Sequence, residues 1–221
     1  GKVDKSSFSQ QTLMEIFING ITNTETLFKT NEPTDLTEWK RLSIDPSGDI
    51  LWISWDCQHL DGPIDLQWLP PPLTKLNLDE NSLHGSLDLT DLPKNLKTLF
   101  VSDNAFSGTI FLDNLPETLQ SLDVSLNRLS GSVNLTKLPK VLKFLFLDSN
   151  SFSGTLDLTC LPPEIDAMHL DNNGFEGETD FRRLPDSLRF MDLENTQLSG
   201  TIHMSGRKRF CVTGSNVVLV T

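Results

Sequence analysis

The chain has 221 residues, a formal net charge of −12 and an ordinary 37% of hydrophobic residues. This acidic balance disfavours nucleic-acid phosphates and anionic membrane surfaces as partners. No apolar run approaches the roughly 20 residues that a membrane span needs, so we expect neither nucleic-acid binding nor membrane insertion.

The N-terminal segment has a helical pattern. Apolar positions from Phe8 to about Phe28 roughly follow helical spacing, and Asn19-Gly20 interrupts them. The pattern predicts one helix near 8–18 and a second short one near 24–29.

Residues 46–206 form an array of about seven repeats of 23 residues, with starts at 46, 69, 92, 115, 138, 161 and 184. The clearest copy is 138–160 (LPKVLKFLFLDSNSFSGTLDLTC), and the copy at 46–68 is degraded. Self-similarity at a fixed period in the twenties is typical of a solenoid, in which each coil stacks on its neighbours.

Two strands are expected in each coil. The Leu-x-Leu pair, Leu145 and Leu147 in the central copy, brackets a short strand of a parallel sheet. The proline at the second position of each repeat starts a turn outside that sheet. A recurrent glycine indicates a positive φ or a close approach of neighbouring coils. The alternating leucines that follow it, such as Leu156 and Leu158, predict a second short strand.

One position of the repeat carries an asparagine. Where the chain turns inward after the strand, backbone groups lose their partners, and stacked amides can both donate to and accept from them. The predicted ladder is Asn81, Asn104, Asn127, Asn150 and Asn173, with Gln58 and Thr196 at its two ends.

Through LxxLxLxxN followed by LxG or FxG, the repeats resemble the leucine-rich repeat (LRR) family, in its plant-type and protist form. The resemblance implies an α/β right-handed solenoid, shaped as an arc, with a parallel sheet on its concave face. It also implies a helical N-terminal cap, here residues 1–45. The Ile-Pro of plant-type repeats is replaced by Asp-Leu-Thr, which favours more strand on the convex side.

Both ends of the array need covering, because a terminal coil would otherwise expose its apolar flank. The cysteine pair that commonly closes the N-terminal cap in secreted relatives is missing. Apolar side chains must therefore hold this cap: Phe8, Leu13, Phe17, Leu36, Trp39 and Leu42. The repeat register fails after Gly206, and residues 207–221 are expected to form a C-terminal strand or hairpin. Its basic triplet, residues 207–209, is expected to be solvated on the rim.

No catalytic constellation is visible. The four histidines fall at different repeat positions, and the chain has no paired-cysteine metal spacing, phosphate-binding glycine loop or HExxH motif. Asp79, Asp148 and Asp171, with Glu194, share one column after the strand. Isolated acids from separate coils rarely make the closed oxygen cage that calcium needs, so a solvated acidic edge is the preferred interpretation. We expect no enzyme activity, no cofactor and no metal.

Residues that alternate with the leucines should point out from the concave face. The predicted partner-binding residues are Trp52, Lys75, Asn77, Phe100, Asp123, Phe144, Phe146, His169, Phe190 and Asp192. Phenylalanines on an open sheet face are unusual unless something covers them, which favours an apolar hot spot for a partner. The alternative is that these rings pack on one another to stabilise the sheet.

The two edges of this face are expected to differ in charge. Lys97, Lys143 and Arg189 precede the strands, whereas acidic residues follow them: Asp79, Asp103, Asp148, Asp171 and Glu194. An aromatic centre between edges of opposite sign suits a polypeptide segment held in one orientation.

The sequence therefore predicts a non-catalytic module that binds a protein or peptide. One alternative is self-association as a weak homodimer instead of a monomer. Another is a receptor-like ectodomain that recognises a small ligand or glycan, which would require secretion. The three widely spaced cysteines are interpreted as free thiols of a cytoplasmic protein, although Gly1 leaves room for a trimmed leader.

Overall fold

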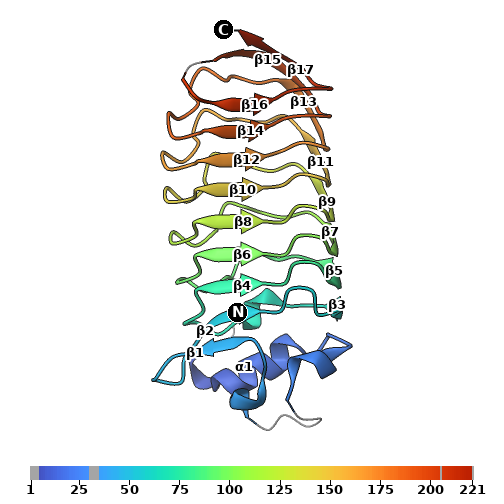
Figure 1. Ribbon diagram of the computed structural model, residues 1–221, viewed down its shortest axis with the longest axis vertical. Coiled ribbons are helices and arrows are strands. Elements are labelled where there is room, and N and C mark those ends of the chain that lie inside the picture. Colours follow the sequence, from blue (N-terminus) through green and yellow to red (C-terminus); the bar gives the residue numbers. More distant parts are fainter. Residues whose placement is uncertain (1–4, 30–34, 205, 221) are drawn as a thin grey trace.

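The computed structural model describes residues 5–29, 35–204 and 206–220 (Figure 1). Within these residues the chain is a parallel β-solenoid of about eight coils with one α-helix at its N-terminal end. This confirms the predicted solenoid. Parts of the predicted N-terminal cap (residues 1–4 and 30–34) and of the C-terminal segment (residue 221) lie outside the described residues.

The helix α1 spans Gln10–Phe17, as the helical spacing predicted. Its first turn is capped by Ser9, whose hydroxyl oxygen accepts a hydrogen bond from the Thr12 amide at 3.1 Å. The second predicted helix is a single 3₁₀ turn. The described 3₁₀ segments are Lys5–Ser7, Thr24–Leu27, Leu36–Glu38 and Leu66–Trp68. Among the described residues no helix is long and apolar enough to cross a membrane.

One sheet contains the Leu-x-Leu strands and faces the viewer in Figure 1. Within the described residues it has nine strands: β1 (Leu42–Ile44), β2 (Ile50–Ser54), β4 (Lys75–Asn77), β6 (Thr98–Phe100), β8 (Ser121–Asp123), β10 (Phe144–Phe146), β12 (Ala167–His169), β14 (Phe190–Asp192) and β16 (Arg209–Cys211). Strand β1 is antiparallel to β2, and the others pair in parallel. From β2 to β14 the paired residues are one repeat apart, such as Phe144 with Ala167. We call its outward side the open face.

The second sheet lies at the side of each coil. Its strands are β3 (Asp61–Pro63), β5 (Ser82–Ser86), β7 (Ala105–Gly108), β9 (Arg128–Gly131), β11 (Ser151–Gly154), β13 (Gly174–Glu178), β15 (Gln197–His203) and β17 (Asn216–Val220). In the central coils these strands run up to the recurrent glycine, so the predicted strand on the leucines after it is wrong.

The reason for this difference is the Asp-Leu-Thr segment. The Asp88 carboxylate accepts hydrogen bonds from the Thr90 amide at 2.9 Å and the Thr90 hydroxyl at 2.7 Å, and Asp157 does the same with Thr159. Such an Asx turn bends the chain where a strand would have to stay extended. The leucine between the two polar residues is buried by this turn instead.

The C-terminal segment is not a hairpin. Strand β16 pairs in parallel with β14, whereas β17 pairs in parallel with β15, so the two belong to different sheets. Residues 209–220 thus follow the path of one more coil, although their sequence has lost the repeat. Five consecutive pairs between β15 and β17 continue the second sheet to the end of the described chain.

The core is a stack of inward side chains that continues from coil to coil. Leu142, Leu145 and Leu147 are each 0% exposed, and the rings of Phe152 and Phe175 stack at 6.0 Å. In the central coil the amide of Leu142 donates to the Pro139 carbonyl at 3.0 Å, which closes the predicted proline turn.

The N-terminal cap packs on the first coil through aromatic rings. Phe17 and Trp39 stack on Trp55 at 6.2 and 6.1 Å. Of the predicted cap residues, Leu13, Phe17 and Trp39 are buried, and Leu36 and Leu42 are partly buried against the core. The sixth, Phe8, is 38% exposed, and its ring contacts Trp68 edge-on at 6.1 Å, so it lies at the surface of the cap and not in its buried core.

The asparagine column forms hydrogen bonds between coils. The Asn127 side-chain oxygen accepts from the Phe106 amide, and its nitrogen donates to three carbonyls, one of them in the preceding coil. The other ladder asparagines repeat this pattern. At the end of the column the Thr196 hydroxyl donates to the Leu193 carbonyl at 2.8 Å.

The residue before each ladder asparagine has a positive φ, and Leu126 is the least suited to it. Its φ is 52° and its side chain is 52% exposed, whereas later coils place Asn172 and Asn195 at this position. Non-glycine residues pay about 1–2 kcal/mol in this region, and asparagine pays least. We expect Leu126→Asn to raise the free energy of unfolding by about 1 kcal/mol in guanidinium titration. An unchanged or lower value would contradict this estimate of the strain.

Candidate binding face

The open face displays two outward columns of side chains between the buried leucines. The predicted binding residues on β4 to β14 are all half-buried, and Trp52 on β2 is 52% exposed. No described helix or strand crosses this face in Figure 1. The face predicted from the repeat is therefore present and uncovered by the described chain.

Four rings on β10, β12 and β14 form one aromatic cluster. Phe144 and Phe146 lie 6.3 Å apart, and His169 lies 4.5 Å from Phe146 and 5.0 Å from Phe190 between ring centres. Phe100 lies on β6, two strands from Phe146. The strand between them, β8, carries Ser121 and Asp123 at the outward positions and no aromatic ring. The predicted aromatic strip is thus a compact cluster with Phe100 outside it. The cluster agrees both with partner binding and with packing that stabilises the sheet, since the rings contact one another yet remain partly exposed.

The aromatic cluster extends to Arg209, which the sequence placed on a solvated rim. Its guanidinium carbon lies 5.8 Å from the centre of the Phe190 ring, in cation–π range. The repeat pattern did not predict this contact, because the repeat ends before Arg209. Residue 209 is 19 positions after Phe190, whereas pairing partners in the array are 23 apart.

The basic edge is not free, which corrects the prediction of edges with opposite charge. Arg189 forms a bidentate ion pair with Asp166, and the Lys143 Nζ lies 3.5 Å from the Glu164 Oε2. The Arg189 guanidinium lowers the pKa of Asp166. These pairs neutralise two of the three predicted cations, so the edge before the strands has little net charge at those positions.

The acidic edge remains largely unneutralised. Burial raises the pKa of Asp79, Asp148 and Asp192, and neighbouring carboxylates raise it further. Asp171 and Glu194 share the column of Asp148, whereas Asp103 lies one position further on, in the turn with positive φ. This side of the open face is therefore suited to a cationic group.

Trp52 marks a separate place at the N-terminal end of the open face. It lines a shallow hollow of about 330 Å³ together with Arg41, Leu42, Ser43 and Ser54. Arg41 itself lies 3.4 Å from Asp56. Because β4, β6 and β8 intervene, Trp52 and the aromatic cluster are distinct parts of one face.

Comparison with solved structures places this geometry among known folds. The chain matches the structure of a pollen receptor kinase 3 with a TM-score of 0.60 and 23% identity, over 93% of this chain and 94% of that one. The chain has the fold of a leucine-rich repeat solenoid. It also matches the Arabidopsis thaliana BIR3–SERK2 complex with a TM-score of 0.57 and 24% identity, over 80% of this chain and 98% of that one. The LRR resemblance is thereby confirmed for the fold.

Likeness in fold does not fix the ligand of this LRR solenoid. A plant ice-binding protein matches with a TM-score of 0.55 and 17% identity, over 94% of this chain and 86% of that one. No protein-family model and no curated protein matches the sequence. Function must therefore be argued from the residues on the open face.

Proposed function

We propose that this LRR solenoid is a non-catalytic module that binds a peptide or protein segment on its open face, with the aromatic cluster as the anchor. The observation that supports it most is a group of Phe144, Phe146 and Phe190 rings on a sheet face that no described element covers. Rings of this kind at the centre of a face contribute most of the binding free energy in known interfaces.

The charges of the face indicate the kind of segment. Acidic side chains follow the strands beside the aromatic cluster, and the lysine and arginine before the strands are already paired. We expect a segment that carries an aromatic or aliphatic anchor and a basic residue next to it. Two neighbours in fold were solved as complexes: BIR3 with SERK2, and the LRR ectodomain of the receptor kinase GASSHO1/SCHENGEN3 with CASPARIAN STRIP INTEGRITY FACTOR 2.

Selection from a displayed random peptide library against the immobilised chain would test the proposal. We expect selected peptides to be enriched in basic and aromatic residues and to lose roughly tenfold or more in affinity with Phe144→Ala plus Phe146→Ala. Phe111→Ala is a matched control, because Phe111 is 60% exposed but lies outside the open face. Binding that is unchanged by the double substitution would rule out the aromatic anchor.

Self-association through the same face is the competing function. Light scattering over a concentration series would detect it, since a homodimer that buries the aromatic cluster should dissociate with Phe144→Asp. A wild-type chain that stays monomeric at high concentration would remove this competitor. A dimer that Phe144→Asp dissolves would assign the cluster to self-association and contradict the peptide proposal.

A further inference from the structure

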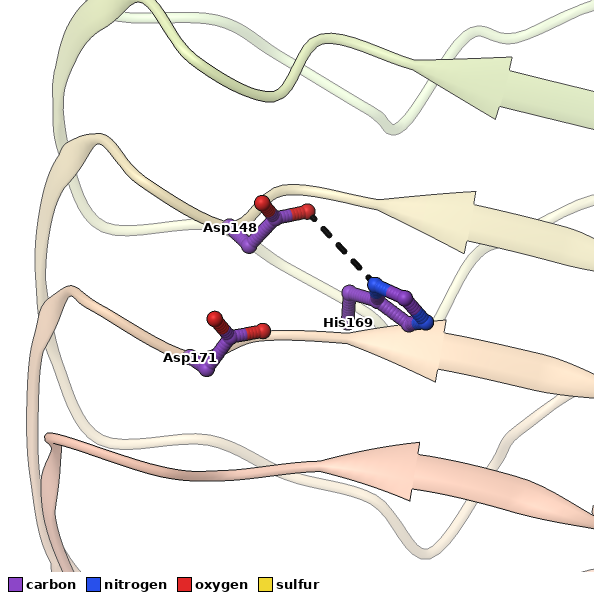
Figure 2. A group of neighbouring side chains, drawn as sticks. All are labelled: Asp148, His169 and Asp171. Carbon is purple, nitrogen blue, oxygen red and sulfur yellow. Dashed lines mark ion pairs between the residues drawn. The ribbon is translucent and has the colours of Figure 1, made fainter. Parts of the chain in front are cut away.

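Three potential metal ligands meet where strands β10 and β12 end. Asp148 follows β10, His169 is the last residue of β12, and Asp171 follows it. One ligand atom from each lies within 4.8 Å of the other two, and His169 Nδ1 is 3.9 Å from Asp148 Oδ1. Figure 2 shows the imidazole and the Asp148 carboxylate pointing toward one another across adjacent coils, with the Asp171 carboxylate on the same coil as His169.

The repeat fixes this juxtaposition. Asp148 and Asp171 occupy the same position of adjacent coils, so parallel pairing brings their backbones to the ordinary spacing of strands. The Leu147 amide donates to the His169 carbonyl at 2.9 Å, and the Ser149 amide donates to the Asp171 carbonyl at 3.0 Å. The three side chains therefore project from backbone that the sheet already holds in place.

The equivalent acid in another coil accepts a hydrogen bond from the backbone of the next coil, but Asp148 does not. The Asp79 carboxylate accepts the Ser102 amide of the next coil at 2.7 Å. Among the other described residues, none donates a hydrogen bond to the Asp148 carboxylate, which accepts one from its own backbone amide, and its one ion-pair neighbour is His169. Asp123 and Asp171 add negative charge around it. A half-buried carboxylate in such surroundings is stabilised by a cation.

The ring of His169 is also held in position. It lies between the rings of Phe146 and Phe190, 4.5 and 5.0 Å away. Packing on both sides restricts the rotation of the imidazole and keeps Nδ1 on the side of Asp148. A metal ligand that is already oriented loses less conformational entropy when it binds.

We propose that Asp148, His169 and Asp171 form a binding site for a zinc ion. Zinc takes imidazole nitrogen and carboxylate oxygen at about 2.0–2.2 Å, which places tetrahedral ligand atoms about 3.4 Å apart. The ligand atoms lie within 4.8 Å of one another, and 3.9 Å apart for His169 and Asp148, so side-chain rotations of up to about 1.4 Å bring them to that spacing. The imidazole disfavours calcium, which takes oxygen ligands only. Three protein ligands leave the fourth position to water or to a bound molecule.

A second group lies one coil further along. Ligand atoms of Asp192, Glu194 and Cys211 are also within 4.8 Å of one another. In both groups one acid already accepts a hydrogen bond: Asp192 accepts from the Glu194 amide at 3.0 Å, and Asp171 accepts from the Asn172 side chain at 2.6 Å. The first group differs in having an imidazole that the rings of Phe146 and Phe190 already hold in position. We therefore assign zinc to the site that contains His169.

Calorimetric titration of zinc chloride into the untagged chain, in a buffer that does not bind metals, would test the site. We expect one zinc per wild-type chain. His169→Gln and Asp148→Asn should each weaken binding by roughly tenfold or more, because losing even an outer partner of a metal ligand costs about 10–100-fold. Asp79→Asn and Cys211→Ser are the matched controls, and we expect both to bind zinc as the wild type does.

The titration uses the free chain, so its result does not depend on the peptide proposal. Absence of zinc from wild type after equilibrium dialysis would overturn the site, as would affinity that survives His169→Gln or is lost with Cys211→Ser. Circular dichroism of each variant shows whether it folds. If the His169 variant does not fold, cobalt bound by the wild type gives a second readout. Tetrahedral absorption bands with a nitrogen ligand support the site, and the spectrum of hydrated cobalt contradicts it.

Discussion

Asn127→Ala is expected to lower the free energy of unfolding by about 4 kcal/mol, since it removes four hydrogen bonds at about 1 kcal/mol each. The amide accepts from Phe106 at 3.0 Å and donates to the carbonyls of Val101, Val124 and Ser125 at 3.0, 3.2 and 2.9 Å. Two of these hydrogen bonds, to Phe106 and Val101, join Asn127 to the preceding coil, so the substitution weakens the contact between two consecutive coils. The stack then becomes less cooperative, which guanidinium titration would report as a lower midpoint and a shallower transition.

The matched control is Asn134→Ala. Asn134 also makes side-chain hydrogen bonds, to Asp113 at 2.7 Å and from the Thr136 amide at 3.0 Å, but these are exposed. Water replaces exposed partners, so we expect a loss of no more than about 1 kcal/mol. Equal losses for Asn127→Ala and Asn134→Ala would show that the ladder does not hold the coils together.

The repeat made the sheet and the outward columns predictable. A 23-residue period fixes which residues pair, so Phe144, Phe146 and Phe190 could be assigned to one face without coordinates. The asparagine column was predictable for a similar reason, because every coil turns inward at the same place and needs the same partner for its backbone.

Contacts made by residues outside the repeat pattern could not be predicted. The contact of Arg209 with Phe190 is such a case. Asp166 could have been found, because it lies one period of 23 residues before Arg189, whereas Glu164 lies 21 residues after Lys143 in another column. The zinc ligands could have been found, because Asp148 and His169 are separated by 21 residues, and His169 and Asp171 by two. His169 lies in a different column of the repeat from Asp148 and Asp171, so no single column contains all three ligands.

The second strand was misplaced for a local reason. Leu87 and Leu89 alternate with polar residues, which is the pattern of a strand. The hydrogen bonds from Thr90 to Asp88 bend the chain there, and side-chain capping of this kind outweighs a short alternation. The recurrent glycine was interpreted correctly, since its φ is positive in every coil and some copies also approach another backbone closely.

Gly62→Ala is expected to have the second large effect, because this glycine is where the N-terminal cap touches the first coil. Its φ is +117°, and an added Cβ would lie 2.1 Å from the carbonyl oxygen of Gly20. The Thr22 amide donates to the Asp61 carbonyl at 2.6 Å beside this contact. A methyl group must therefore push the cap backbone away and weaken the bridge that joins the two parts.

Gly108→Ala separates this contact from backbone strain. Gly108 has a φ of +84° in the same column, but its added Cβ would meet nothing within 4 Å. It should cost only the roughly 1–2 kcal/mol of an alanine at positive φ, whereas Gly62→Ala should cost about 1–3 kcal/mol more through overpacking. Hydrogen exchange of the Thr22 amide should also become faster in Gly62→Ala alone, because the cap then opens without unfolding the array. Equal stabilities and an unchanged exchange rate would mean that the cap adapts to the methyl group, and that its attachment depends on the stacked rings of Phe17, Trp39 and Trp55 instead.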